Sequence, residues 1–596
     1  MCGIFGYSLK NNTSRNFDMN FVLKSMEYRG PDSSGTFLKD SVGLGMNRLS
    51  IVGISELYQP ITSQDNRYTI VYNGEVFNAF DLRQFLISKG YVFKSQTGDT
   101  EVVLAAYIFF GDECVHLFNG MFAFVIYDSI EQTLTGFVDR VGIKPLFYTL
   151  GNDEFFFSSE IKSISKNISR NYTLNPNALF DYFRLQYVPF SATIYSDIYR
   201  LKPGQKFKYF IRRHDLSVTT WYCQRKKLIS TFNFEDFRNA FEDAVERWVI
   251  SEVSFGVSLS DGLDSSLIAT ILAKKKYTFN AYTLRYCIEG FDSYNEFSVS
   301  NSLSRKYGFK HVMVDINKDK LTSEMPFIFK ALSEPYSGGI SSFFIYKSMR
   351  EYGEKVAMTG VGGDEIFGNY GKWRIYNQPM SLARQSLRNF IDEQFVYTRI
   401  QGLNYKLFLD NFRVKKLFND EYSLNYFDNE KNNGLRKRIS QLVINGLNKK
   451  DIVRNLDLNL QLPYEFLMMT DRFSMFNSIE ARTPFLDRDF MQKMLDYKYT
   501  DISDQLDNKF ILRKLFNVYN EDLKIDKSKK GFDFPDTLFY EINKELITYL
   551  LSKEFLKKQN IFNIRLTTDF LKFNYPSIYR NLVYFQLWYY YNEYTS

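Results

Sequence analysis

The pattern of predicted strands and helices changes near residue 234, and this change constrains the fold more than any other feature. Before about residue 210, short apolar segments bounded by Asn and Gly, such as Tyr68–Tyr72 and Met121–Tyr127, predict strands, with short helices between them. From Phe234 onward, predicted strands and helices alternate along the chain. Such alternation implies a parallel sheet with helices on both faces, so the two parts should differ in fold class.

The second part divides into individual elements. Helices are predicted at 234–249, 265–276, 295–307 and 343–352, and strands at 253–259, 280–286, 312–314 and 355–359. A mostly helical region follows at about 378–475. The predicted domains are 2–210 and 230–596, and the polar stretch Tyr209–Thr231 is interpreted as the connector between them.

Composition excludes several classes of protein. Hydrophobic residues make up 45% and charged residues 24%, which is ordinary for globular proteins and excludes a disordered or collagen-like chain. No run of about 18 apolar residues occurs, so neither a transmembrane helix nor a membrane partner is expected. The first residues lack the basic and apolar regions of a signal peptide, and the expected location is the cytoplasm.

Charge, cysteine and histidine content narrow the chemistry further. The formal net charge of +7, from 75 basic and 68 acidic residues, is mild, so a mixed surface is expected and a nucleic-acid partner is not. The four cysteines form no CxxC pair, which argues against zinc and agrees with a reduced cytosolic protein. The three histidines lie in no motif, so a nucleophile must find another base.

Cys2 is the most informative single residue. Removal of Met1 would leave a thiol and a free α-amine on the same residue. Because an α-amine has an ordinary pKa of about 7.7–8.0, it can serve as the general base for that thiol. A cysteine that only packs as a small hydrophobe is the alternative interpretation. The motifs that follow Cys2 favour the nucleophile.

These motifs occur in a fixed order over the first 162 residues. They are CGIFG at 2–6, YRGPD at 28–32, NRLSIV at 47–52, QP at 59–60, YNGE at 72–75, GDTE at 98–101, FNGMFA at 118–123, DRVGIKPL at 139–146 and SSEIK at 158–162. Together they resemble the glutaminase domain of the glutamine-dependent asparagine synthetase family. The resemblance implies an N-terminal-nucleophile hydrolase domain, an α+β fold with stacked antiparallel sheets.

The resemblance also assigns the hydrolytic groups. It implies that the Cys2 thiolate attacks the side-chain amide of glutamine and that two donors stabilise the resulting oxyanion, the Asn73 side chain and the Gly74 backbone N–H. One such donor is typically worth about 2.7–4 kcal/mol in the transition state.

The rest of the implied glutamine site recognises the α-amino acid group. Arg48 would form a forked pair with the α-carboxylate, and Glu75 and Asp99 would hold the α-ammonium group. Val52 completes this implied site, together with Asn73 and Gly74. Two other charged residues, Arg29 and Asp32, are interpreted as residues that order loops.

A phosphate-binding loop is predicted after the strand at 253–259. That strand runs into Ser260-Asp261-Gly262-Leu263-Asp264-Ser265-Ser266, which opens a helix, and such a loop forms an anion cradle of backbone N–H groups. No Walker A motif is present. The segment resembles the SGGxDS pyrophosphate loop of ATP pyrophosphatases, the fold of the synthetase half of the same family. It implies an α/β domain with a parallel sheet and a helical C-terminal part.

A second glycine-rich loop, at 359–368, resembles the SGxGxDExFGGY loop of the family. Asp264 and Asp364 would then hold Mg²⁺ against the pyrophosphate of ATP. Both loops follow strands of one sheet, where open α/β sheets bind ligands. The resemblance implies an ATP site made of Ser258, Ser260, Gly262, Asp264, Ser265, Ser266, Tyr282, Thr359, Gly360 and Lys529.

Two later segments extend the resemblance. EARTPFLD at 480–487 is similar to the EARxPFLD segment of the family, and Glu480 and Arg482 are interpreted as a buried pair that shapes the pocket. The basic segment 527–532 with Pro535 resembles RxKxGFxxP. Lys529 would there neutralise departing phosphate charge, with a solvated basic run as the alternative.

Three positions depart from the family pattern. Asp261 replaces a glycine, which places a negative charge beside the phosphate loop and would be strained at positive φ. Asn369 replaces another glycine, a milder change. Val361 stands where asparagine synthetases carry an acid that is thought to assist adenylation and ammonia attack. Either another carboxylate such as Glu365 compensates, or the acceptor is not aspartate.

The sequence therefore predicts a two-domain amidotransferase that uses glutamine, ATP and a carboxylate acceptor, with a homodimer as one option for its oligomeric state. Aspartate is the default acceptor, giving asparagine, and a uronic acid sugar of a surface polysaccharide is the alternative. The complete Cys2 set disfavours a β-lactam synthetase relative. A regulatory protein without activity would lack catalytic groups in both domains, whereas only Val361 looks lost.

Overall fold

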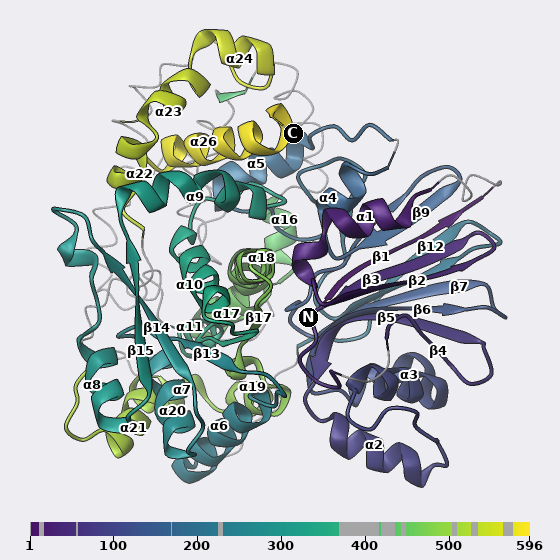
Figure 1. Ribbon diagram of the computed structural model, residues 1–596, viewed down its shortest axis with the longest axis horizontal. Helices are drawn as coiled ribbons and strands as arrows, with labels where there is room; N and C mark the ends of the chain where they lie inside the picture. Colours follow the sequence, from purple (N-terminus) through teal and green to yellow (C-terminus); the bar gives the residue numbers. More distant parts are fainter. Residues whose placement is uncertain are drawn as a thin grey trace.

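The computed structural model shows two domains side by side, with the N-terminal domain built mainly from strands and the C-terminal domain mainly from helices around a sheet (Figure 1). The structure describes residues 2–10, 17–54, 58–168, 170–224, 231–368, 417–418, 435–442, 449–503, 509–525, 534–563, 572 and 576–595.

The N-terminal domain contains two six-stranded antiparallel sheets. One has the order β10-β8-β9-β1-β3-β2, and the other has the order β12-β11-β7-β6-β5-β4. The strands are β1 Cys2–Leu9, β2 Ser33–Lys39, β3 Val42–Arg48, β4 Ile61–Thr62, β5 Tyr68–Val76, β6 Gly120–Asp128, β7 Thr133–Val138, β8 Phe147–Leu150, β9 Glu154–Ser158, β10 Tyr199–Arg200, β11 Gln205–Phe210 and β12 Asp215–Thr220. The helices are α1 Met19–Ser25, α2 Ala79–Ser88, α3 Asp99–Phe110, α4 Ile161–Ser165 and α5 Pro176–Leu185.

The two sheets stack face to face, because alternate side chains of each sheet share one core. Ile4 and Leu44 of the first sheet belong to the same buried cluster as Val71 and Val125 of the second. The outer face of the second sheet is covered by α2 and α3, whose buried residues cluster with those of β5 and β6. This arrangement confirms the predicted fold class of stacked antiparallel sheets.

The predicted connector Tyr209–Thr231 is partly part of a sheet. Its residues 209–210 end β11 and its residues 215–220 form β12, and these two strands pair along their whole length. The N-terminal sheet therefore continues to Thr220, past the boundary predicted at residue 210. The sequence of β12 is polar because this strand lies at the edge of the sheet and is mostly exposed. For this reason the segment was interpreted as a linker.

The C-terminal domain is organised around a five-stranded parallel sheet of order β15-β14-β13-β16-β17. Its elements are α6 Phe234–Trp248, β13 Phe255–Ser258, α7 Leu263–Lys274, β14 Asn280–Tyr286, α8 Ser298–Tyr307, β15 Lys310–Ile316, α9 Lys318–Ala331, α10 Ile340–Glu351, β16 Val356–Met358, α11 Gly363–Phe367 and β17 Glu480–Arg482. Strand order reverses between β13 and β16, so the loops after these two neighbours meet at the carboxyl edge, which is where open α/β sheets commonly bind ligands. Neither α9 nor β17 was predicted from the sequence.

Both faces of this sheet are buried, as expected. Val257 and Met358 cluster with α6 and α7, whereas Tyr282 and Ala357 cluster with α9, α10 and α18 (Met468–Phe476). Because neighbouring residues on one strand point to opposite faces, single strands such as β16 contribute to both cores.

The remaining described elements are helical and extend from residue 435 to residue 594. They are α16 Leu435–Ser440, α17 Lys449–Leu456, a π-helical stretch Asp457–Leu467, α18 Met468–Phe476, α19 Arg488–Asp496, α20 Tyr499–Ile502, α21 Phe510–Tyr519, α22 Asp536–Ile542, α23 Lys544–Leu550, α24 Lys553–Gln559, α26 Pro576–Tyr589 and a final π-helical turn Tyr590–Tyr594. The described parts of the region predicted as helical at 378–475 are mostly helical, while the stretch before residue 417 lies outside the described residues.

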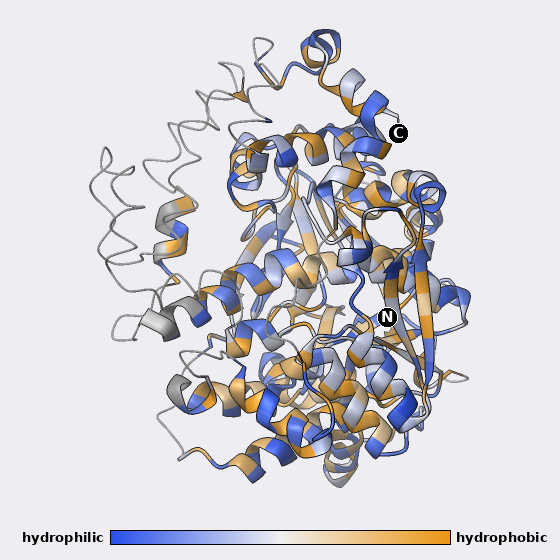
Figure 2. Cartoon of the chain, turned by 90° about the vertical axis from the view of Figure 1, so that its left-hand side faces the viewer, coloured by the Kyte–Doolittle hydropathy of each residue, from blue (hydrophilic) through white to orange (hydrophobic). Residues whose placement is uncertain are grey.

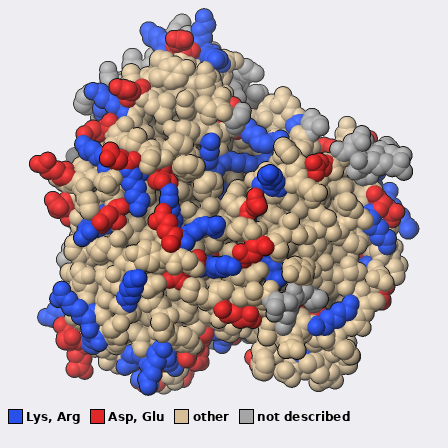
Figure 3. Space-filling view, in the orientation of Figure 1, with Lys and Arg blue, Asp and Glu red and all other residues tan. Residues whose placement is uncertain are grey.

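The C-terminal helix α26 returns to the N-terminal domain. Asn581 Nδ2 donates to the Phe183 carbonyl of α5, and the Tyr182 hydroxyl donates to the Asn581 carbonyl. Individual helices carry both hydrophobic and hydrophilic residues (Figure 2). Within the described residues, no helix combines the length and the apolar character needed to cross a membrane. Basic and acidic side chains are interspersed on the face shown in Figure 3.

Candidate active sites of the two domains

Cys2 opens β1 at the centre of the first sheet and lies opposite Arg48 of β3. Its backbone nitrogen donates to Asn73 Oδ1 at 2.9 Å, which joins the first sheet to β5 of the second. The side chain is 6% exposed, and burial raises the pKa of the Cys2 thiol above its usual value. Asn73 Nδ2 is buried without a hydrogen-bond partner among the described residues. A buried amide donor without a partner is costly, so this group fits an oxyanion site.

Gly74 follows Asn73 on β5, where only glycine fits. A Cβ atom at this position would lie 2.3 Å from the Met121 carbonyl oxygen of the neighbouring strand β6. The close pairing of β5 with β6 therefore requires a residue without a side chain, and it fixes the backbone beside the pocket.

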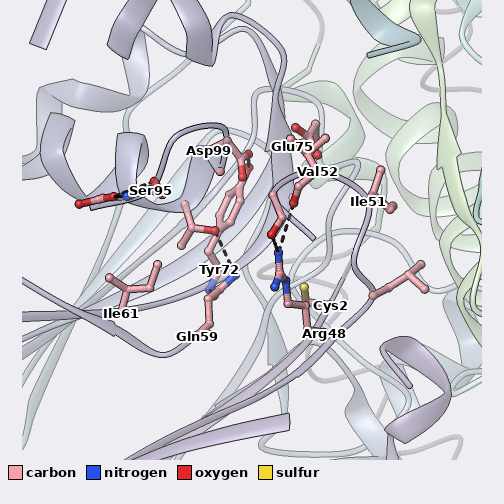
Figure 4. A pocket seen from close by; sticks show the side chains of 16 residues that line it. Cys2, Arg48, Ile51, Val52, Gln59, Ile61, Tyr72, Glu75, Ser95 and Asp99 are labelled. Carbon is pink, nitrogen blue, oxygen red and sulfur yellow. Dashed lines mark hydrogen bonds between the residues drawn. The ribbon is translucent and has the colours of Figure 1, made fainter. Parts of the chain in front are cut away.

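A pocket next to Cys2 contains most of the predicted glutamine-binding residues (Figure 4). Its lining includes Cys2, Arg48, Val52, Gly74, Glu75 and Asp99. Arg48 Nη2 donates to the carbonyl oxygens of Val52 at 3.2 Å and Gly53 at 2.7 Å. Arg48 Nη1 is buried without a hydrogen-bond partner among the described residues, so this nitrogen can donate to a carboxylate. Val52 thus contributes through its carbonyl.

Glu75 and Asp99 place two buried carboxylates in the same pocket. Burial raises the pKa of both groups, and the neighbouring Asp99 carboxylate raises the pKa of Glu75 further. Asp99 Oδ2 accepts hydrogen bonds from the Tyr72 hydroxyl at 2.6 Å and from the Val76 N–H at 2.9 Å. A cation between these carboxylates would relieve their repulsion, which is what an α-ammonium group offers.

Two further residues shape this pocket, and the motif analysis did not single them out. Tyr72 holds Asp99, and Gln59 accepts from the Tyr72 N–H at 2.8 Å while it donates to Thr100 Oγ1 at 3.1 Å. Both stand inside motifs that the sequence shows, QP at 59–60 and YNGE at 72–75. Their positions next to predicted site residues are the signal that could have identified them.

Arg29, interpreted from the sequence as a loop-ordering residue, instead joins the two domains. Its guanidinium is fully buried and contacts Glu160 at 2.6 Å and Asp471 of α18 at 2.9 Å. Its Nε donates to the Cys2 carbonyl at 3.4 Å. Asp32 does order a loop, because its carboxylate accepts from the Ser50 N–H at 2.7 Å.

In the C-terminal domain, the loop after β13 is held by its own serines. The Ser260 N–H donates to Ser265 Oγ at 3.1 Å, and the Gly262 N–H donates to Ser260 Oγ at 3.2 Å. Ser266 Oγ donates to the Ser260 carbonyl at 3.3 Å. This network curls the loop at the N-terminus of α7, which is the geometry that favours phosphate.

Asp261 does not face this loop. Its carboxylate accepts from the N–H and hydroxyl groups of Ser298 and Ser300, at 2.7 to 3.1 Å, and so caps the start of α8. Its φ is not in the left-handed region. The carboxylate is therefore directed away from the phosphate loop, and the backbone of Asp261 does not have the strained conformation expected from the sequence.

The second loop packs directly on the first. A Cβ at Gly360 would lie 2.9 Å from Asp264 Cβ, and a Cβ at Gly363 would lie 2.8 Å from Asp264 Cγ. Gly362 has a φ of +95°, which disfavours a side chain. The glycines of this loop therefore allow Asp264 and Asp364 to approach one another.

Both carboxylates meet the same ammonium group. Lys509 Nζ lies 2.5 Å from Asp264 Oδ2 and 2.5 Å from Asp364 Oδ1. Burial alone would lower the pKa of Lys509, but the two carboxylates raise it above its usual value. Lys509 was not predicted, because it stands just before α21 in no motif considered, and only the packing of α21 against α7 brings it to the loops.

This convergence suits a magnesium site built partly by substrate. The two carboxylates already share a cation, and Mg²⁺ is commonly held by one or two carboxylates with phosphate oxygens and water. Within the described residues, no group of three or more His, Cys, Asp or Glu side chains could hold a metal alone. Thr359 Oγ1, at the start of the second loop, is buried without a hydrogen-bond partner among the described residues, as expected for a site completed by ligand.

Tyr282 is the predicted ATP-site residue that the structure does not bring to the loops. Its side chain is fully buried in the core, and its hydroxyl donates to Glu354 at 3.2 Å, before the start of β16. Alternation along β14 directs this side chain onto Gly256, where a Cβ would lie 2.7 Å from Tyr282 Cε2. Ser258, by contrast, ends β13 next to the loop.

Of the other predicted positions, two lie outside the described residues and three can be placed. Lys529 and Asn369 lie outside the described residues. Val361 is partly buried and packs against the apolar cluster of α6 and α7, so it offers no polar group to the site. Glu480 and Arg482 form the predicted buried pair, with Arg482 Nε 2.6 Å from Glu480 Oε1, on strand β17.

Comparison with known proteins agrees with the division of the chain into two domains. The family described as "Glutamine amidotransferase domain" matches residues 1–222, and the family described as "Asparagine synthase" matches residues 236–589. The chain is 28% identical to asparagine synthetase (glutamine-hydrolysing) 1 of Bacillus subtilis over 569 residues, covering 90% of this chain and 87% of the relative. It is 27% identical to asparagine synthetase 3 of the same organism, covering 92% and 89%. A putative asparagine synthetase of Mycobacterium tuberculosis is 29% identical, covering 78% and 75%.

Proposed function

Because the chain belongs to the asparagine synthase family, we propose that it is a glutamine-dependent asparagine synthetase. The proposed reaction hydrolyses glutamine to ammonia, activates aspartate with ATP, and forms asparagine, AMP and pyrophosphate. The observation that carries the glutamine half is the pocket beside Cys2. Arg48 Nη1 in its lining and Asn73 Nδ2 next to Gly74 have no hydrogen-bond partner among the described residues. With the two buried carboxylates, these donors match the groups of an α-amino acid amide.

In the N-terminal domain, the proposed chemistry starts when Met1 is removed and the Cys2 nitrogen becomes an amine. This amine takes the thiol proton, and the sulfur attacks the amide carbon of glutamine. Asn73 Nδ2 and the Gly74 N–H stabilise the oxyanion. Collapse breaks the C–N bond, the amine returns the proton to the leaving ammonia, and water then hydrolyses the thioester to glutamate.

In the C-terminal domain, the proposed site for the phosphates of ATP is the N-terminus of α7, where the loop after β13 is curled by its serines. Asp264 and Asp364 would hold Mg²⁺, which supplies charge neutralisation of the pyrophosphate. The acceptor carboxylate attacks the α-phosphorus atom and releases pyrophosphate. Ammonia delivered from the other domain then attacks the acyl carbon, and AMP leaves as the amide forms.

The experiment that tests this proposal is an acceptor screen that follows pyrophosphate release with glutamine as nitrogen donor. Aspartate should support release and asparagine formation, and uronic acid sugars should not. Val361→Glu should preserve or raise activity on aspartate, because it restores the acid found in asparagine synthetases. Release with a uronate but not with aspartate would overturn aspartate as the acceptor, whereas formation of ADP and phosphate would overturn the reaction type.

A further inference from the structure

The connection between α6 and β13 in the C-terminal domain reaches the mouth of the glutamine pocket. Glu252 makes four contacts with the N-terminal domain. Its N–H donates to the Ile51 carbonyl at 3.0 Å, Oε1 accepts from the Gly53 N–H at 2.8 Å and Thr97 Oγ1 at 3.2 Å, and Oε2 accepts from the Ile54 N–H at 3.4 Å. One carboxylate therefore holds two separate segments of the other domain.

Both segments form the glutamine pocket. Ile51, Val52 and Gly53 line it on one side, and Gly98 and Asp99, which follow Thr97, line it on another. The carbonyls of Val52 and Gly53 are the partners that orient Arg48. A change in the position of this loop would therefore move the guanidinium that is proposed to bind the α-carboxylate.

Glu252 is itself held by the parallel sheet. Arg482 of β17 donates to the carbonyls of Trp248 and Ile250, at 3.0 and 2.5 Å, and so braces the connection that carries Glu252. The Arg482 carbonyl accepts from the N–H of Thr359, the first residue of the second nucleotide loop. Arg482 Nη2 also lies 3.8 Å from Glu75 Oε2 in the glutamine pocket.

We propose that Glu252 is a positioning residue for glutamine that the C-terminal domain supplies. By binding the backbone N–H groups of Gly53 and Ile54, it fixes the loop whose carbonyls orient Arg48. It does not touch Cys2 or the reacting atoms, so it affects glutamine binding and not the hydrolytic step. The inference rests on the proposed glutaminase activity of the Cys2 pocket.

The side chain of Glu252 is exposed, which separates this role from a structural one. An exposed carboxylate contributes little to folding, so substitutions at this position should leave the protein folded. Its hydrogen bonds to backbone N–H groups are charge-assisted, and such bonds are about twice as strong as neutral ones. Loss of the carboxylate should then free the loop without disturbing either core.

The test compares Glu252→Ala and Glu252→Gln with the wild-type full-length protein. Glu252→Ala should raise the KM for glutamine about tenfold and leave kcat for glutamine hydrolysis within about twofold. Glu252→Gln keeps one acceptor oxygen and should raise KM about threefold. Ammonia-dependent amide synthesis should not change in either variant. The matched control is Glu351→Ala, an exposed acid of the same domain at the end of α10.

Three results would overturn the inference while leaving the proposed function intact: an unchanged KM in Glu252→Ala, a fall in kcat at constant KM, or an equal loss of ammonia-dependent synthesis. A wild-type protein that does not hydrolyse glutamine would instead overturn the proposed glutaminase. The wild-type assay therefore separates failure of the function from failure of the inference.

Discussion

The glutamine pocket and the nucleotide loops are prepared for their ligands in opposite ways. At the pocket, Asn73 Nδ2 and Arg48 Nη1 are buried without a hydrogen-bond partner among the described residues, on strands of two stacked sheets. At the loops, the carboxylates of Asp264 and Asp364 already share the ammonium group of Lys509. The first site gains hydrogen bonds when a ligand arrives, whereas the second must rearrange a cation that is already present.

This difference follows from the charges involved. A neutral amide or one guanidinium nitrogen can stay buried without a partner at a cost of about 1–3 kcal/mol. Two neighbouring ionised carboxylates need compensation, because an uncompensated buried charge costs several kcal/mol. In the pocket, burial raises the pKa of Glu75 and Asp99, which favours their neutral forms. At the loops, Lys509 supplies a counter-charge to the two carboxylates that are proposed to hold Mg²⁺.

The largest expected effect removes the proposed nucleophile of the pocket. Cys2→Ala should lower glutamine hydrolysis by at least about a thousandfold, because it removes the thiol that is proposed to attack the amide. Ammonia-dependent synthesis should persist, since the nucleotide loops lie in the other domain. Glutamate release and AMP formation measure the two activities, and Cys223→Ala, at an exposed cysteine, is the control. Normal hydrolysis in Cys2→Ala would show that the pocket is not the glutaminase site.

The second effect tests the two carboxylates of the nucleotide loops. Asp264→Asn and Asp364→Asn should each lower amide synthesis about a hundredfold while glutamine hydrolysis continues, because an amide holds a divalent cation more weakly than a carboxylate. Pyrophosphate release and glutamate release distinguish the two activities. Equal loss of both would mean that the sites are not separable as their geometry indicates.

The third effect concerns the resident cation. Lys509→Met should reduce the free energy of unfolding by about 3 kcal/mol, because it removes the ammonium group that two partly buried carboxylates share. Added Mg²⁺ should restore part of this loss. Urea unfolding with and without Mg²⁺ measures both quantities, and Lys514→Met, on the exposed face of the same helix, is the control. A variant with wild-type stability and no response to Mg²⁺ would contradict the role of Lys509.

The same comparison explains which site residues the sequence could predict. Cys2, Arg48 and Asn73 each sit in a recognisable motif, and neighbouring strands β1 and β3, with β5 across the sandwich, bring them together. Asp264 and Asp364 were predicted to meet because their loops follow strands that prove to be neighbours in the sheet. The alternation of strands and helices was sufficient to predict the parallel sheet, whereas the stacked antiparallel sheets were implied by the family resemblance.

The residues that could not be predicted depend on tertiary packing alone. Lys509 and Glu252 carry no motif, and their partners lie 145 or more residues away in the chain. Tyr282 was assigned to the ATP site although strand alternation turns its side chain into the core. A motif indicates which residues are present near a site, but the register of the strand decides which of them point toward it.

The fourth effect is a pH dependence confined to the pocket. Burial raises the pKa of Glu75 and Asp99 above their usual values, so both become neutral at a higher pH than ordinary carboxyl groups. A neutral carboxyl group cannot pair with the α-ammonium of glutamine, so the KM for glutamine should rise as the pH falls, by about tenfold across one pH unit at most. The KM for ATP, measured in parallel, should not follow. A KM for glutamine that stays constant as the pH is lowered would contradict this reading of the two carboxylates.

The smallest effect concerns Asp261, where one substitution tests both the stability of α8 and the affinity of the nucleotide loop for ATP. Asp261→Gly restores the residue usual in the family but removes the carboxylate that caps α8, and it adds backbone freedom to the unfolded chain. The free energy of unfolding should fall by about 1 kcal/mol, while Asp261→Asn, which keeps an acceptor oxygen, should lose about half as much. Because the carboxylate faces Ser298 and Ser300 and not the phosphate loop, the KM for ATP should stay within about twofold of the wild-type value in both variants. A marked gain in ATP affinity in Asp261→Gly would show that the negative charge of Asp261 acts on the phosphates of ATP. The nucleotide loop would then resemble the glutamine pocket, where Glu75 and Asp99 also place carboxylates next to the proposed ligand.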